Sequence, residues 1–244
     1  GLVKTIKFKN AKYVGDPINA VRIFNEKEAD ELIILDIDAS VNNTEPDYEM
    51  IRHIAKECRM PLCYGGGIKT LEQAEKIIAL GVEKIALSSV VVDNPYLIVE
   101  IAKKLGRQSV VVVLDVKKSM LSNNYTVWSH NAKNNTKRNV SKMIRQIQKL
   151  GVGELVLNFV DFDGTGKGYP ILAVQELKKQ IKVPLTIMGG AKTLEDMGDA
   201  VKKCGLIGVA AGSLFVFKGN YRAVLINYPE LKHKERLVYE KFYL

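Results

Sequence analysis

Short hydrophobic stretches alternate along the chain with stretches in which hydrophobic residues recur at helical spacing. The short stretches are typical of parallel strands buried on both faces, and we predict strands over residues 31–37, 61–64, 84–87, 109–115, 154–159, 184–188 and 206–210. The stretches between them predict helices over 17–28, 48–58, 71–80, 95–105, 137–150, 171–180 and 194–203. This alternation indicates a parallel sheet with right-handed β–α–β crossovers.

The second half of the chain repeats the first. The string Gly66–Glu72 returns as Gly189–Glu195, with six identities in seven positions and an offset of 123 residues. The same offset aligns Leu32–Asp38 with Leu155–Asp161. An open doubly wound sheet also fits the alternation, but two matching halves of four β–α units close naturally into an eight-stranded barrel. We therefore predict a (βα)8 TIM barrel as one domain over residues 1–244, with half-barrels over about 1–106 and 107–217 and a C-terminal helix or tail over 218–244.

The first strand of such a barrel is not evident in the sequence. The strand 109–115 has no counterpart in the first half, because the offset would place its mate before Gly1. Residues 1–17 predict a loop or a short hairpin instead. Either residues precede Gly1, or the barrel closes in another way. The segment Arg236–Leu244 could supply a strand, and a helix that ends in a frayed tail is the alternative.

Composition narrows the class of protein. The chain has 244 residues, 47% of them hydrophobic, and its apolar runs are too short to span a bilayer. It begins with no signal peptide, and Cys58, Cys63 and Cys204 show no ligand spacing, so we expect a cytosolic protein with reduced thiols. The formal charge of +9 could attract nucleic acid or phosphorylated small molecules. Because many lysines lie in dispersed pairs on predicted helices, we favour a solvated surface and expect neither a nucleic acid nor a membrane partner.

Glycines and serines follow the strands in both halves. Gly66 and Gly67 match Gly189 and Gly190, while Ser88 and Ser89 match positions 211 and Gly212, with Ser213 directly beyond. Glycine lets backbone N–H groups approach a phosphate closely, and the following helix adds a favourable dipole. Glycines that only permit tight turns are the structural alternative. Two such sites in register predict a substrate with a phosphate at each end.

Carboxylates end several of the same strands. Asp36 and Asp38, Asp115, and Asp161 and Asp163 all fall where strands of a TIM barrel carry catalytic residues. Asp115 is the strongest candidate, because a buried strand would raise its pKa and suit it to general acid–base catalysis. We expect Asp163–Thr165 to shape a loop that orients the ligand. His53, His130 and His233 show no nucleophile pattern, and neither a metal site nor a cofactor is predicted.

Six segments of the chain, which occur in the same order as in a known family, carry a specific resemblance to that family. They are DELIILDIDAS from Asp30, YGGGI from Tyr64, EKIALSSVVVDNP from Glu83, VVVVLDVK from Val110, DFDGTGKGY from Asp161 and GGAKTLE from Gly189. Together they resemble the HisF family, the cyclase subunits of imidazole glycerol phosphate synthase, up to about residue 217. The resemblance implies a (βα)8 barrel of two half-barrels. It also implies a lyase that combines ammonia from a HisH-type glutaminase partner with a bis-phosphorylated ribotide.

The resemblance also implies roles for individual residues. Asp115 matches one of two catalytic aspartates of the family, and Lys4 matches the lysine of the mobile first loop. The two phosphate sites correspond to Gly66, Gly67, Ser88 and Ser89, and to Gly189, Gly190, Gly212 and Ser213. The substrate loop corresponds to Asp163, Gly164 and Thr165. The charged ring that controls ammonia entry corresponds to Glu31, Lys84 and Glu154.

Departures from the family pattern cluster around the predicted substrate. The first catalytic aspartate of the family would lie on the strand that is not evident here. Met188 stands where the family has a serine, which would cost a hydrogen bond worth about 0.5–1.5 kcal/mol. Ser88, Asn131 and Val216 replace a usual asparagine, serine and histidine.

Three functions follow from these observations. Histidine biosynthesis is the family default. A paralogue that supplies ammonia for amidation of a sugar in surface-glycan biosynthesis explains the departures better. A non-catalytic ammonia conduit that activates the glutaminase is the third possibility.

Overall fold

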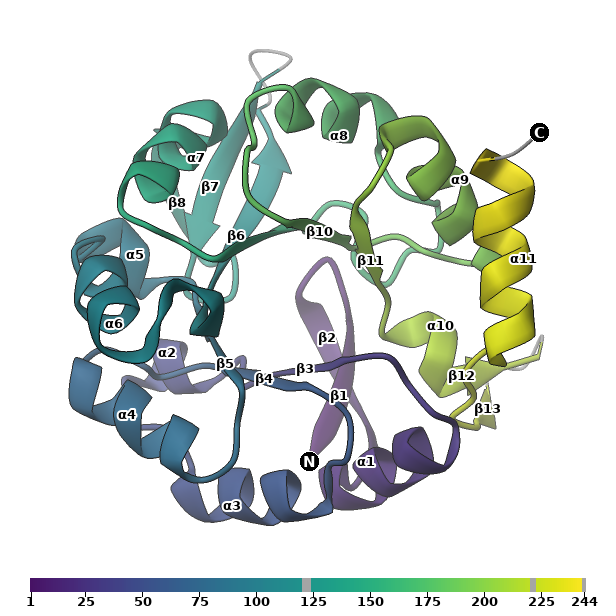
Figure 1. Cartoon of the computed structure of the whole chain (residues 1–244), viewed down its shortest axis with the longest axis horizontal. Helices are drawn as coiled ribbons and strands as arrows, with labels where there is room; N and C mark the ends of the chain where they lie inside the picture. Colours follow the sequence, from purple (N-terminus) through teal and green to yellow (C-terminus); the bar gives the residue numbers. More distant parts are fainter. Residues whose placement is uncertain (120–123, 220–222, 243–244) are drawn as a thin grey trace.

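A curled parallel sheet ringed by helices forms the body of the protein (Figure 1). The computed structural model describes residues 1–119, 124–219 and 223–242, and the side chains of all of these except 238–242. In the parallel part of the sheet the strand order is β11-β10-β9-β6-β5-β4-β3. The strands are β3 (Leu32–Leu35), β4 (Leu62–Gly65), β5 (Lys84–Leu87), β6 (Val110–Lys118), β9 (Glu154–Phe159), β10 (Leu185–Met188) and β11 (Gly208–Ala210). All seven predicted strands are confirmed, and the fold is the predicted α/β fold of TIM-barrel type.

The predicted helices are confirmed as elements. They are α1 (Pro17–Glu26), α3 (Tyr48–Glu57), α4 (Leu71–Ala79), α6 (Leu97–Leu105), α7 (Val140–Lys149), α8 (Ile171–Lys178) and α9 (Leu194–Cys204). Three single-turn helices, α2 (Ala39–Asn42), α5 (Val90–Asp93) and α10 (Ser213–Val216), and a 3-10 turn, η1 (Arg107–Ser109), complete this layer.

The repeat predicted from the sequence is also a structural repeat. Shifting β4 by 123 residues gives the bounds of β10, and shifting the first residue of α4 gives the first residue of α9. Both helices begin with a capping box, formed by Thr70 with Gln73 and by Thr193 with Asp196. The repeated Lys-Thr-Leu-Glu sequence is therefore a helix start, in which side chains satisfy the first backbone N–H groups.

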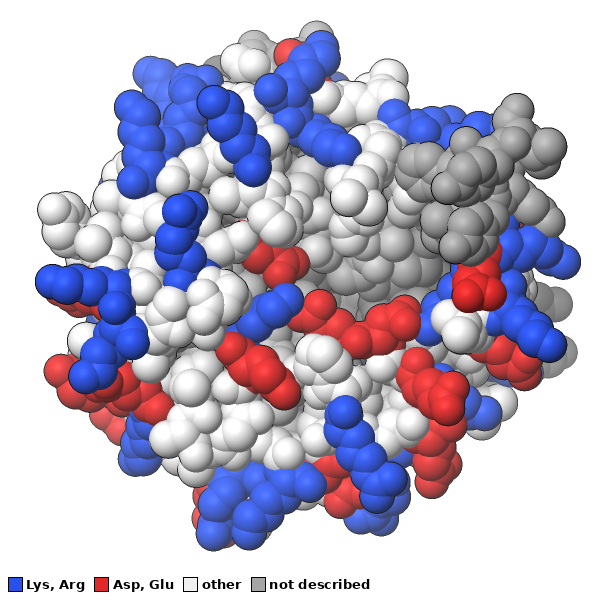
Figure 2. Space-filling model, viewed as in Figure 1, with Lys and Arg blue, Asp and Glu red and all other residues white. Residues whose placement is uncertain are grey.

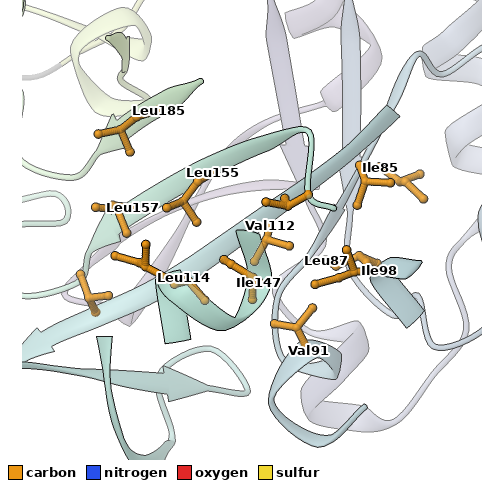
Figure 3. Packing of buried hydrophobic residues seen from close by; sticks show 14 of the residues in the cluster. Ile85, Leu87, Val91, Ile98, Val112, Leu114, Ile147, Leu155, Leu157 and Leu185 are labelled. Carbon is orange, nitrogen blue, oxygen red and sulfur yellow. The ribbon is translucent and has the colours of Figure 1, made fainter. Parts of the chain in front are cut away.

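The hydrophobic core lies between the outer face of the sheet and the helices (Figure 3). Ile85 and Leu87 from β5, Val112 and Leu114 from β6, and Leu155 and Leu157 from β9 are at most 1% exposed. They pack in one cluster with Ile98 of α6 and Ile147 of α7. The inner face carries a smaller cluster of Cys63, Ala86, Val111, Val113 and Val156. This division follows from the alternation of side chains along each strand, which sends odd and even positions to opposite faces.

An antiparallel hairpin was missed by the sequence analysis. Residues 137–139, predicted as the start of a helix, belong to β8 (Asn134–Asn139), which pairs with β7 (Tyr125–Ser129). In turn β7 pairs with β6, and β6 therefore extends to Lys118 instead of ending at Asp115. The Asn139 side chain accepts a hydrogen bond from the Lys142 N–H at 3.2 Å, and it fixes the start of α7 three residues later than predicted.

The N-terminal residues form the predicted short hairpin, β1 (Leu2–Ile6) and β2 (Lys9–Gly15). Among the described residues, β3 and β11 are the two edges of the parallel sheet and no strand pairs between them. One cavity is lined by both edges and by the hairpin. The hairpin therefore lies against the open side of the curled sheet without joining its hydrogen-bond ladder.

The C-terminal segment is helical. Of the strand considered over 236–244, residues 236–242 belong to α11 (Leu231–Phe242), so that alternative is wrong, and 243–244 lie outside the described residues. A two-stranded ribbon, β12 (Phe217–Lys218) with β13 (Ala223–Val224), precedes the helix. Lys234 of α11 forms an ion pair with Asp30 at 2.6 Å, and Tyr228 donates to the same carboxylate at 2.7 Å. These contacts fasten α11 beside the start of β3. In the part of the chain that is described, no helix has the length and apolar character needed to cross a membrane.

Candidate active site

Asp115 is the buried carboxylate that the sequence analysis expected. It is 8% exposed and lies on the inner face of β6, since Val111 and Val113 precede it on that face. Its Oδ1 accepts a hydrogen bond at 2.8 Å from Nδ2 of Asn158, its register partner on β9. Burial raises the pKa of Asp115 to about 7, partly offset by the Asn158 hydrogen bond. The raised pKa is confirmed, and it populates both protonation states near neutral pH, as general acid–base chemistry requires.

Asp115 shares a cavity with the first predicted phosphate site. This mouth cavity, at the C-terminal ends of the strands, is lined by Gly66, Gly67, Ser88, Ser89, Asn131, Asn158 and Asp115, among others. Gly66 has φ of 121°, and a Cβ there would lie 2.5 Å from the Asp36 carbonyl oxygen. Only glycine therefore fits this turn, whose backbone can approach a ligand closely. The structure brings together the residues predicted for one phosphate and for the acid–base group.

Two contributors to the mouth cavity, the contact of the β7–β8 turn with Ser89 and the side chain of Asn158, were missed from the sequence, whereas Asn131 was among the departures expected around the substrate. The turn between β7 and β8 places its His130 N–H 2.8 Å from Ser89 Oγ, and the adjacent Asn131 lines the cavity. Asn158 was missed because an asparagine within the hydrophobic run of β9 gives no motif of its own. The sequence feature that could have identified it is a polar residue in a buried parallel strand, because such a side chain requires a hydrogen-bond partner.

Two other strand-end carboxylates, those of Asp36 and Asp161, accept hydrogen bonds from backbone N–H groups. Asp36 Oδ1 accepts hydrogen bonds from the N–H groups of Asp38 and Ala39 at 3.0 and 3.1 Å. Asp161 accepts from the Lys118 N–H at 3.0 Å. The Asp38 side chain is exposed and makes no capping bond to α2. Asp115 therefore differs from these three: its carboxylate accepts a hydrogen bond from a side chain inside the cavity, whereas Asp36 and Asp161 accept from backbone N–H groups and Asp38 makes no capping bond.

A second cavity contains the second predicted phosphate site. This hairpin cavity is lined by Lys4, Thr5, Asp163, Gly164, Met188, Gly189, Gly190, Gly212 and Ser213, among others. Asp163 Oδ2 accepts a hydrogen bond from the Thr5 hydroxyl at 2.7 Å, and the Lys7 N–H donates to the Asp163 carbonyl oxygen at 2.9 Å. Burial raises the pKa of Asp163, while Thr5, the Phe8 N–H and Lys4 act to lower it. The N-terminal hairpin is thus tied to the predicted substrate loop.

Thr165 is placed differently from the rest of its loop. Its hydroxyl donates to the Phe162 carbonyl oxygen at 2.7 Å, and the residue does not line the hairpin cavity. Met188 does line it. Neither side chain therefore presents a hydroxyl donor to a ligand in this cavity.

At the strand starts, the opposite end of the sheet, three charged residues form a ring. Lys84 Nζ lies 2.8 Å from Glu31 Oε1 and 3.0 Å from Glu154 Oε2, and Thr186 donates to Glu154 Oε1 at 2.8 Å. Burial acts to lower the pKa of Lys84, but the two carboxylates outweigh it and the pKa is raised. The small side chains of the inner cluster, which include Cys63 and Val156, lie between this strand-start ring and the mouth cavity.

The positive charge is less dispersed than the sequence analysis concluded. Between Asp115 and Glu154 the chain contains eight Lys and Arg residues and no Asp or Glu, against a net charge of +9 for the whole chain. Seven of the eight, at the end of β6, on the turn after β7, on β8 and on α7, are exposed. On the face in Figure 2, basic side chains lie along the edge over α7 and at other parts of the rim, and several acidic side chains lie nearer the centre. Much of the excess positive charge therefore belongs to the part of the chain between Asp115 and Glu154.

Comparison with known proteins agrees with the family resemblance found in the sequence. The pattern of the family described as histidine biosynthesis protein matches residues 1–222. A protein of Vibrio vulnificus (strain YJ016), provisionally named imidazole glycerol phosphate synthase subunit hisF3, is 57% identical over 97% of this chain and 91% of its own length. A provisionally named HisF subunit of Leptospira borgpetersenii is 52% identical over 97% and 93%. The HisF subunit of imidazole glycerol phosphate synthase from Exiguobacterium sibiricum is 35% identical over 88% and 85%.

Proposed function

The chain belongs to the histidine biosynthesis protein family and is a HisF-type synthase subunit, and from this premise we propose that it joins ammonia from a HisH-type glutaminase to a phosphorylated acceptor. The observation that carries the proposal is the position of Asp115. A buried carboxyl whose pKa is about 7 lies in one cavity with the Gly66–Gly67 turn, so an acid–base group and a phosphate site face the same space. Lys4 and the hairpin cavity would hold the second phosphate. A cytosolic location is part of the same proposal.

The inner face of the sheet supports an ammonia route. The ring of Glu31, Lys84 and Glu154 lies at one end and Asp115 at the other. Between them the inner side chains are apolar, and Ala86 and Val113 line the mouth cavity as well. Neutral ammonia crosses such an apolar region at a far lower desolvation cost than an ion does. We therefore assign the glutaminase to the strand-start face, where the ring would control entry.

Lys84→Met is expected to uncouple the two half-reactions. Methionine keeps the length of the side chain but removes both ion pairs of the ring, leaving Glu31 and Glu154 without their cation. Turnover supported by glutamine should fall about tenfold or more, while turnover supported by added ammonium salt should stay within about twofold of wild type. The measurement is the ratio of product formed to glutamine hydrolysed in the complex. Lys104→Met is the matched control, because its ion pair with Glu75 lies on the exposed surface. An unchanged ratio for Lys84→Met would remove the ring from the ammonia route.

Two observations favour an acceptor other than that of histidine biosynthesis. Met188 lines the hairpin cavity where the family has a hydroxyl. The chain is also 57% and 52% identical to two provisionally named subunits but 35% identical to the HisF of Exiguobacterium sibiricum. Both support a divergent branch that supplies ammonia to another acceptor, with amidation of a sugar in surface-glycan biosynthesis as the candidate reaction.

Genetic complementation distinguishes the acceptor of histidine biosynthesis from a different acceptor. The complete reading frame is expressed in a histidine auxotroph that lacks the cyclase, with and without its own glutaminase. A divergent acceptor predicts no growth, although the protein folds and binds the glutaminase. Growth on medium without histidine, lost again in Asp115→Asn, would establish the biosynthetic cyclase instead. If the protein stimulates glutamine hydrolysis but yields no product with any phosphorylated acceptor, it is an ammonia conduit.

A further inference from the structure

Asn158 contains a buried hydrogen-bond acceptor with no partner among the described residues. The residue is 2% exposed, and its Nδ2 is used by Asp115 Oδ1 at 2.8 Å. Its Oδ1 is the buried side-chain oxygen that no described group satisfies. Leaving such an acceptor unpaired is destabilising, and buried polar atoms in proteins are therefore nearly always paired. In a site, such an acceptor is satisfied by a water molecule or by a ligand that donates a hydrogen.

The position of Asn158 limits the size and chemistry of that ligand. The side chain lines the mouth cavity and faces inward from β9, in register with Asp115 on β6. Two positions earlier on the same strand, Val156 belongs to the apolar inner cluster. Asn158 and Asp115 are thus the first polar side chains above that cluster on their two strands. A small donor that arrives along the apolar inner face would reach them before any other polar group of these strands.

We propose that Asn158 is the ammonia receptor of this site, its Oδ1 accepting an N–H of ammonia beside Asp115. This inference rests on the proposed function. Ammonia has three N–H donors and one lone pair, so a bond to Oδ1 satisfies the buried acceptor and leaves the lone pair available for attack. A second N–H can reach the Asp115 carboxylate when that group is ionised. The Nδ2 bond to Asp115 gives Asn158 a second effect, since it helps to hold the Asp115 carboxylate in place.

Binding is tested without any acceptor substrate. The side-chain amide signals of Asn158 are followed by NMR in the full chain while ammonium chloride is added at about pH 9, where a large share of the ammonium is neutral ammonia. A saturable shift is expected, with none when potassium chloride is added to the same ionic strength. The absence of a saturable shift would overturn the proposal, whatever the acceptor of the enzyme is.

Kinetics in the complex test the role in turnover. Asn158→Leu keeps the shape of the side chain and removes its polar atoms, while Asn158→Thr retains an oxygen acceptor. In Asn158→Leu the KM for added ammonia should rise about tenfold, as expected for one lost hydrogen bond, with the KM for the phosphorylated acceptor unchanged. Asn158→Thr should recover part of this loss. The inflection in the pH profile near neutral pH should move upward in Asn158→Leu, because a bond that lowers the Asp115 pKa is lost.

The remaining outcomes contradict the proposal in distinguishable ways. If the KM for the phosphorylated acceptor rises and that for ammonia does not, Asn158 binds an N–H of the acceptor. If both KM values and the pH profile stay the same while thermal stability falls, Asn158 has a structural role. If wild type forms no product from ammonia, the proposed function fails, and the NMR titration alone then decides whether ammonia binds at Asn158.

Discussion

Asp115→Asn is expected to lower ammonia-dependent turnover by about 10²–10⁴-fold, the usual contribution of a general acid–base group. Asparagine has the shape of aspartate, and its oxygen can still accept the hydrogen bond that Asn158 Nδ2 donates. What it loses is the ability to take up and release a proton near neutral pH, which burial gives to Asp115. Turnover is measured with ammonium salt, and binding of the glutaminase is measured separately. Binding should be unchanged, because Asp115 lies at the opposite end of the sheet from the strand-start ring.

The same variant is expected to become more stable than wild type as the pH rises, because it lacks the pH-dependent loss of stability that Asp115 causes. The folded pKa of Asp115 is raised from 3.8 to about 7, so wild type loses stability as pH rises from about 4 to about 7. Asparagine has no charge to bury, and the free energy of unfolding of the variant should therefore exceed that of wild type above pH 7, by up to about 4 kcal/mol. Below about pH 4 the Asp115 carboxyl is protonated in both the folded and the unfolded wild type, so its titration should no longer separate the stability of wild type from that of the variant. Denaturant unfolding at several pH values measures the difference.

Asp38→Asn is the matched control for both measurements. It removes a carboxylate from the same rim, but one that is exposed and makes no capping bond. It should change neither turnover nor the pH dependence of stability appreciably. Retention of wild-type turnover by Asp115→Asn would show that this carboxyl is not the acid–base group.

Gly190→Ala is expected to destabilise the fold by about 3 kcal/mol or more, which lowers Tm by about 10 °C in a chain of this size. Gly190 has φ of 113°, and a Cβ there would lie 2.2 Å from the Gly168 carbonyl oxygen. The backbone cannot yield easily, since the Gly168 N–H donates to the Gly190 carbonyl oxygen at 2.8 Å. This pair ties the loop after β9 to the glycine turn after β10.

Gly212→Ala is the control for this prediction. A Cβ at Gly212 would have no atom within 4 Å, so its effect on stability should be within about 0.5 kcal/mol. Thermal and denaturant unfolding of the two variants give the comparison. Similar stabilities would show that Gly190 is retained only for a ligand and not for the packing of the turn.

The glycine repeat shows how far sequence reasoning reached. The offset of 123 residues correctly predicted that β4 and β10, and α4 and α9, are equivalent. The repeat alone could not show which residues of the repeated segment face a ligand and which start a helix, because the segment contains both kinds. Its glycines allow a close backbone approach, whereas its Thr70 and Thr193 cap helices. Only the capping geometry separates the ligand-facing part of the repeat from the helix start.

The β7–β8 hairpin shows where local reasoning failed. Its sequence, with polar residues at almost every position of β8, has neither a strand pattern nor a helix pattern. It is a strand because β7 offers it backbone partners, and β7 in turn pairs with β6 beyond Asp115. Whether two segments of the chain pair as strands cannot be predicted from the composition of either segment alone.

The sequence by itself determined the parallel strands, the helices and their repetition, because burial on both faces and helical amphipathicity leave periodic patterns along a chain. It also determined that Asp115 would be buried. The tertiary structure alone decided that Asn158 is its partner, that Ser89 receives the His130 N–H, and that Asp36 and Asp161 accept hydrogen bonds from backbone N–H groups instead. The physical reason is that hydrogen bonds between side chains and loops depend on distances across neighbouring strands. Those distances are fixed only when the sheet curls and its register is set.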